Sequence, residues 1–199
     1  MTRTPLLLTV AIAVALAGCA TTTPTASAAA ASTQAAESKA QQLNRLYDEY
    51  WEELLKLNPI QATFQGDPRY NDQLPNFLSA EYRAQQHAFT QRWLERIQAV
   101  GPDGLEGQDL LSYEIFLHDA KMALEGEQFP GELIPINQFF NLANLPVMFG
   151  SGTGAQPFKT VADYDAWRRR AALVPAVFDQ AIANMKEGVA KGVVQPKVL

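Results

Sequence analysis

Apolar side chains recur at steps of three and four residues through most of this 199-residue chain. This spacing is typical of helices that bury one face. Pro, Gly and Asn-Asp pairs interrupt the spacing and mark the connections between helices. No segment alternates apolar and polar residues with a clean period of two, which is the pattern of a half-buried strand. The sequence therefore predicts an all-α fold, an irregular multi-helix array over residues 37–199.

The expected helices cover about residues 37–57, 60–64, 80–99, 107–125 and 161–191, with turn-forming residues between them. Ser79 is the expected N-cap of the third helix, and Thr160 with Asp163 predicts a capping box for the last segment. Pro175 either kinks this segment or opens a new helix at its first turn. Residues 127–159 are rich in Pro and Gly, so we expect a long connection with one short helix at most.

The start of the chain has the features of a bacterial export signal. Arg3 precedes an apolar run at 6–17, which is shorter than the roughly 20 residues needed to span a membrane. The run therefore matches the apolar part of a signal peptide. It ends in Leu16-Ala17-Gly18-Cys19, which resembles the lipobox of bacterial lipoproteins. In those proteins the Cys thiol receives a diacylglyceryl group and the chain is cut just before the Cys. The resemblance implies a signal peptide at 1–18 and a lipid on Cys19.

Residues 19–36 follow as an Ala-, Thr- and Ser-rich stretch without a large apolar side chain, which predicts a flexible tether. The lipid on Cys19 would attach the chain to a membrane. The residue after Cys19 is Ala20 and not Asp, which in Gram-negative lipoproteins implies transfer to the outer membrane. The expected location is therefore the bacterial cell envelope, at the outer membrane and facing the periplasm.

The charge balance argues against nucleic acid as a partner. The chain has 16 Lys and Arg against 21 Asp and Glu, a net charge of −5, so there is no basic excess to neutralise phosphates. The basic run at 167–170 has three arginines that fan around a helix, and we expect a solvated surface paired with acids. The one Cys is the expected lipid site, which excludes disulfides and Cys-based zinc sites.

Two other patterns have both a functional and a structural interpretation. Glu114 and His118 lie four residues apart on an expected helix. They are either two ligands of a metal site that needs a third ligand from elsewhere, or a surface Glu–His contact. The glycine-rich segment 150–154 lacks the Gly-Lys-Ser/Thr of a nucleotide-binding loop. We favour the structural interpretation of both, a surface contact and a flexible loop.

A series of short motifs resembles the bacterial domain of unknown function 885 family over about residues 40–199. The motifs occur in the same order as in that family, and they are Pro59-Ile60-Gln61-Ala62-Thr63, Gly66-Asp67, Asn71-Asp72, Pro135-Ile136-Asn137-Gln138, Asp163-Tyr164 and the segment from Gly188 through Gly192 to Pro196. The resemblance implies a secreted or lipid-anchored protein, considerably longer than this chain. It also implies a large α-helical fold similar to zinc metallopeptidases, many of which carry a His-Glu-x-x-His motif in the C-terminal half.

This chain has no His-Glu-x-x-His motif, so no catalytic or metal-binding residue transfers to it. We expect no cofactor in this segment, with zinc and a peptide substrate belonging to a longer protein. The leading interpretation is the N-terminal helical region of a lipid-anchored, metallopeptidase-like protein. Its connection 127–159 would then lie near a substrate cleft, with Asn137, Gln138, Phe139 and Phe140 as the candidate cleft residues.

The alternative interpretation is a non-catalytic envelope lipoprotein that acts as a binding or scaffold module. The coding sequence beyond codon 199 separates the two interpretations. A downstream His-Glu-x-x-His motif favours the enzyme, whereas a stop codon favours the binding module.

Overall fold

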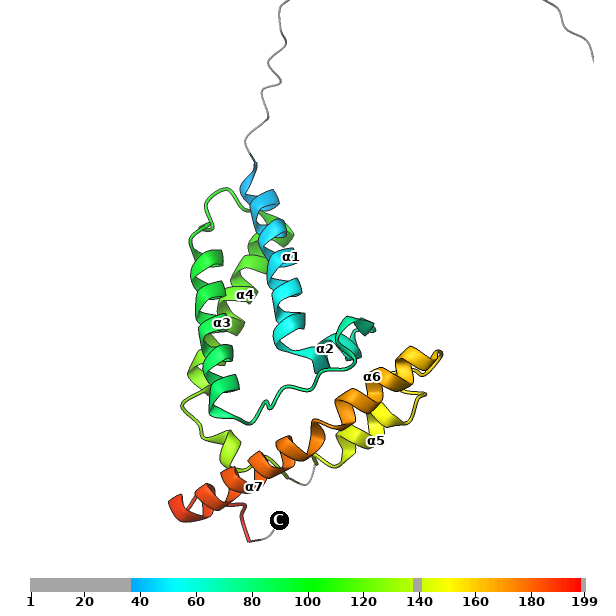
Figure 1. Ribbon diagram of the computed structural model, residues 1–199. Helices are drawn as coiled ribbons and strands as arrows, with labels where there is room; N and C mark the ends of the chain where they lie inside the picture. Colours follow the sequence, from blue (N-terminus) through cyan, green and yellow to red (C-terminus); the bar gives the residue numbers. More distant parts are fainter. Residues whose placement is uncertain (1–36, 138–140, 198–199) are drawn as a thin grey trace, which may run out of the picture. The chain divides into compact units, whose positions relative to one another are not determined.

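The computed structural model describes residues 37–137 and 141–197, and these residues form helices without any strand (Figure 1). The prediction of an all-α fold is therefore confirmed for the described part of the chain. The predicted signal peptide, Cys19 and the tether lie outside the described residues. The same is true of Gln138, Phe139 and Phe140.

Three long helices form the first part of the fold: α1 (Lys39–Leu57), α3 (Ala80–Gln98) and α4 (Gly107–Gly126). Ser38 begins α1 with a capping box, in which its hydroxyl accepts from the Gln41 N–H at 3.2 Å. Ser79 begins α3, as predicted, by accepting from the Tyr82 N–H at 3.1 Å. The three helices share one apolar core, made by Leu43, Leu46, Phe89, Trp93, Ile97, Val100, Leu105 and Tyr113.

The remaining elements are short except for the last helix. They are α2 (Pro59–Phe64), η1 (Pro68–Tyr70), η2 (Gly131–Leu133), α5 (Asn144–Gly150), α6 (Val161–Ala171) and α7 (Val174–Lys191). The predicted capping box of Thr160 and Asp163 opens α6. Pro175 lies in the first turn of α7 and does not kink one long helix. A second apolar core holds α7 against the preceding segments through Leu74, Leu78, Leu142, Val177 and Ala181.

The glycine-rich segment 150–154 packs closely against two aromatic rings. A Cβ atom on Gly150 would lie 2.7 Å from the Trp167 ring, and one on Gly152 would lie 2.8 Å from the Phe158 ring. Gly152 also has a φ of +70°, which side chains disfavour. These glycines let α5 and the following turn approach α6, which lies beside α5 in Figure 1. These glycines therefore allow close packing on two rings, a role that the expectation of a flexible loop did not include.

Within residues 37–137 and 141–197, no helix is both long enough and apolar enough to cross a membrane.

Candidate functional site

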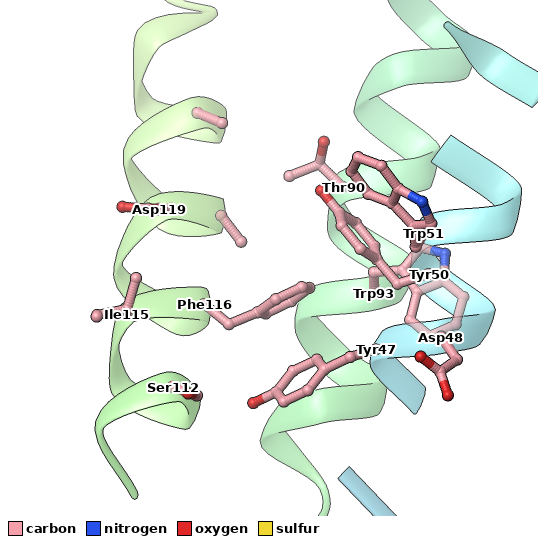
Figure 2. Close-up of a pocket in the computed structure, with 12 residues that line it drawn as sticks. Tyr47, Asp48, Tyr50, Trp51, Thr90, Trp93, Ser112, Ile115, Phe116 and Asp119 are labelled. Atoms are coloured by element: carbon pink, nitrogen blue, oxygen red, sulfur yellow. The ribbon is translucent and has the colours of Figure 1, made fainter. Parts of the chain in front are cut away.

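A groove of about 700 Å³ lies between α1, α3 and α4, and we call it the aromatic groove. Five aromatic rings line it: Tyr47, Tyr50 and Trp51 from α1, Trp93 from α3, and Phe116 from α4. The rest of its lining consists of Asp48, Thr90, Ser112, Ile115, Asp119, Ala120 and Ala123. Side chains from α1 and α4 line two sides of the groove, and Thr90 and Trp93 come from α3 (Figure 2).

The rings of the aromatic groove contact one another across the helices. Phe116 reaches from α4 toward Tyr47 and Tyr50 on α1 (Figure 2), with ring centroids 5.7 Å and 4.9 Å away. Tyr50 also meets the edge of Trp93 at 5.6 Å. Such tilted and edge-on pairs stabilise beyond the area they bury. The rings are therefore held in place before any ligand arrives.

Ion pairs hold α1 and α3 together beside the aromatic groove. Arg96 on α3 binds the Glu49 carboxylate at 2.6 Å, and the Trp93 indole N–H donates to Glu53 at 3.1 Å. Arg92 also binds Glu53. The hydrogen bonds of Arg96 and then of Arg45 hold the pKa of Glu49 below its usual range. These contacts join α1 and α3 on one side of the groove.

The hydroxyl of Tyr47 is closed off from solvent and has no hydrogen-bond partner among the described residues. Burial raises the pKa of this phenol, and it raises that of the Tyr50 phenol as well. A buried hydroxyl without a partner destabilises a protein by about 1–3 kcal/mol. Because the hydroxyl is closed off, the Tyr47 ring lines the groove while its oxygen does not face a ligand there.

Helix α4 exposes more apolar surface than a helix on the edge of a core normally does. Tyr113 is its buried side chain, while Leu111, Ile115 and Met122 are each about half exposed. These three residues make the apolar arc of α4 broad, a feature that favours contact with more than one neighbour. The helix does contact both α3 and α1, but in the described structure these three side chains face solvent.

A second hollow, of about 640 Å³, lies beyond the end of α4, and we call it the polar pocket. Its ionisable residues are Arg83, His87, Glu127 and Glu132. His87 Nδ1 and Glu127 Oε2 are 2.6 Å apart. Arg83 donates to the Leu78 carbonyl at 2.7 Å and lies 3.5 Å from Glu132.

Asn137 lines the polar pocket. It is the one candidate cleft residue from the sequence that the structure describes, and it does lie at a hollow. The other three, at 138–140, are outside the described residues.

The Glu114–His118 pattern does not form a site within the described part of the chain. Both side chains are exposed on α4, and no hydrogen bond or ion pair joins them there. Across residues 37–137 and 141–197, no three His, Cys, Asp or Glu side chains gather closely enough to hold a metal ion. The described residues therefore do not fit a zinc site, which needs at least three protein ligands.

The expectation of a solvated basic surface at 167–170 is wrong for Arg170. Arg168 and Arg169 are exposed and lie near Asp165 and Asp72, but Arg170 is only 1% exposed. Its guanidinium turns inward over the Phe149 ring, 5.0 Å from the centroid. Because successive residues of a helix point in different directions, one of three consecutive arginines can face the core. A buried arginine is rare unless acceptors surround it.

Oxygen acceptors surround Arg170, and one of them, Thr63, belongs to a motif that carries the family resemblance. Thr63 Oγ1 and the Tyr70 carbonyl accept at 2.8 Å, and the Gln73 carbonyl accepts at 2.9 Å. Gln156 Oε1 also accepts at 2.9 Å. Thr63 thus has a structural role, which sequence reasoning missed because it did not connect this residue to the arginines.

Comparison with known proteins supports the resemblance noted from these motifs. No curated protein and no solved structure matches the chain. Residues 59–199 match the family model described as "Bacterial protein of unknown function (DUF885)". Because the match covers most of the chain, this protein belongs to that bacterial family.

Proposed function

We propose that the aromatic groove binds a peptide through the apolar side chains of that peptide. The observation that carries the proposal is the convergence of five aromatic rings on an open groove of about 700 Å³. Ligand sites are typically apolar hollows with a few placed polar groups. Thr90 and Ser112 supply such polar groups through the hydroxyls of their side chains.

The length of the groove favours a peptide over a compact small molecule. Its lining on α4 extends from Ser112 to Ala123, which is about 16 Å at 1.5 Å per helical residue. Ile115 on one wall and Trp51 on the other are 49% and 39% exposed. An elongated apolar groove with exposed apolar edges fits an amphipathic segment that inserts several side chains in a row.

The cellular setting is part of the same proposal. A lipid on Cys19 would hold the chain at the bacterial outer membrane, so that the groove meets peptides in the periplasm. The bound peptide is then either a partner segment of a binding module or the substrate of a longer, metallopeptidase-like protein. Sequencing the gene beyond codon 199 distinguishes these two forms of the proposal, because only the second requires a downstream His-Glu-x-x-His motif.

Fluorescence polarisation tests the binding. The probe is a fluorescein-labelled peptide of neutral polar residues, with Leu placed along one helical face, added to the full chain. We expect saturable binding that Ile115→Asp weakens at least about tenfold, since the new carboxylate lies in the apolar wall. Val189→Asp is the matched control, because Val189 is 69% exposed on α7 and does not line the groove. Absent binding, or equal loss in both variants, would refute the proposal.

Cell fractionation tests the anchor. We expect Cys19→Ser to abolish lipid attachment, because a hydroxyl does not replace the thiolate in thioether formation. The variant should leave the outer-membrane fraction. Recovery of the variant in that fraction with unchanged mass would overturn the lipoprotein assignment.

A further inference from the structure

The aromatic groove and the polar pocket lie on the same faces of two helices. On α3, Thr90 lines the groove. His87, three residues before Thr90, and Arg83, four residues before His87, line the pocket. On α4, Ala123 lines the groove, and Glu127 lines the pocket four residues later, just past the helix end. Side chains at these steps are neighbours on a helix surface. The pocket therefore continues the groove along the α3–α4 edge.

The lining of the groove and the pocket together carries mostly negative charge. Its lining holds the carboxylates of Asp48, Asp119, Glu127 and Glu132 against the single guanidinium of Arg83. Within the described part of the chain, Asp48 and Asp119 form no ion pair. Asp119 lies close enough to add to the effect of burial on the Tyr50 phenol. Such a surface attracts cations and disfavours acidic ligands.

The two glutamates of the polar pocket have partners that a cationic ligand can replace. Glu127 binds His87, and an imidazole carries a charge only when it is protonated. Glu132 has Arg83 at 3.5 Å, which is longer than a good charge-assisted hydrogen bond of about 2.8 Å. An ammonium group from a ligand would give either carboxylate a closer and fully charged partner.

We infer that the aromatic groove and the polar pocket form one continuous track, and that its ligand is a basic amphipathic peptide. The apolar residues of the peptide lie in the groove, and a lysine or arginine at one end lies against Glu127 and Glu132. This inference rests on the proposed function, to which it adds the charge of the peptide and the extent of its site.

Three labelled peptides with identical Leu positions test the inference on the full chain. The first is the neutral peptide described above, the second carries Lys at its polar positions, and the third carries Glu there. We expect the Lys peptide to bind at least about tenfold more tightly than the Glu peptide in low salt. The difference should shrink as salt is added, because these exposed charges are screened.

Variants then locate the cationic contact. The double variant Glu127→Gln and Glu132→Gln should weaken the binding of the Lys peptide at least about fivefold more than that of the neutral peptide. Asp179→Asn is the matched control, since Asp179 is exposed on α7 and lines neither site. It should change the affinity for neither peptide.

The outcomes separate this inference from the proposed function. If all three peptides bind equally and Ile115→Asp still weakens them, the groove binds peptides and the basic ligand is refuted. If the double variant changes nothing while Asp48→Asn weakens the Lys peptide, the continuous track is refuted. If no peptide binds, the proposed function fails and the inference fails with it. If sedimentation shows a dimer that Ile115→Asp dissociates, a second copy occupies the groove and the inference is refuted.

Discussion

The guanidinium of Arg170 donates a 2.8 Å hydrogen bond to the hydroxyl of Thr63, which lies 107 positions earlier in the chain. This bond joins α6 to α2, and the carbonyls of Tyr70 and Gln73 extend the connection to η1 and to the segment after it. Burial lowers the pKa of Arg170 to about 10, so the side chain still carries its charge at neutral pH. The surrounding oxygens, which are neutral, are what stabilise this buried charge.

Replacing Arg170 should therefore lower the free energy of unfolding substantially. Arg170→Met removes the donor for several buried oxygens at once, and we expect a loss of about 3 kcal/mol or more in the free energy of unfolding. Arg168→Met is the control, because the Arg168 side chain is 83% exposed; it should change stability by less than about 0.5 kcal/mol. Urea denaturation followed by circular dichroism measures both, and similar small losses would contradict the role given to Arg170.

Gly188 should not tolerate a side chain. A Cβ atom there would lie 2.7 Å from the Val193 carbonyl oxygen and 2.9 Å from that of Leu133. Because both neighbours are backbone atoms, Gly188→Ala should destabilise the protein by about 1–3 kcal/mol. Gly126→Ala is the control, since the space around Gly126 is open. It should be neutral or slightly stabilising, as Ala favours helix more than Gly does. Thermal melting curves that do not differ between the two variants would show the prediction to be wrong.

Tyr47→Phe should separate stability from binding. Removing a buried hydroxyl that has no partner in the described structure should leave stability unchanged or raise it by about 1 kcal/mol. The same variant should bind the neutral peptide as tightly as the original chain, because Phe keeps the ring that lines the groove and the removed hydroxyl is closed off from it. The pair of measurements is a melting curve and a polarisation titration. A destabilised variant with unchanged affinity would indicate that the hydroxyl has a structural partner instead.

Acid should weaken the contact between α1 and η1. Arg69 binds Glu52 at 2.7 Å and Asp67 at 2.6 Å, and its hydrogen bonds hold the pKa of both carboxyls below the usual range. Their stabilising effect is complete above the ordinary carboxyl pKa of about 4. It is lost as the pH falls through the lower folded-state values.

Arg69→Gln removes the cation that both carboxyls share. The melting temperature of this variant should therefore fall less than that of the original chain between about pH 6 and about pH 3. Parallel pH curves for the two proteins would argue against this ion-pair group as a source of acid sensitivity.

The local features of the fold follow from residues close together in the chain. Ser79 and Thr160 cap α3 and α6 by bonding residues three positions ahead. A helix start depends on such neighbours, so the amino-acid pattern predicts it wherever the capping residue is present. The all-α class follows in the same way, because apolar periodicity reports which side of each helix is buried.

The candidate site depends instead on contacts between distant segments. The apolar residues of α4 point in several directions, so their periodicity does not indicate that Phe116 meets Tyr50 while Ile115 stays exposed. Three consecutive arginines look alike in the sequence, yet only Arg170 lies where oxygens from residues 63, 70, 73 and 156 converge. Packing brings these atoms together across up to 107 positions, and no short-range pattern encodes which of them will meet.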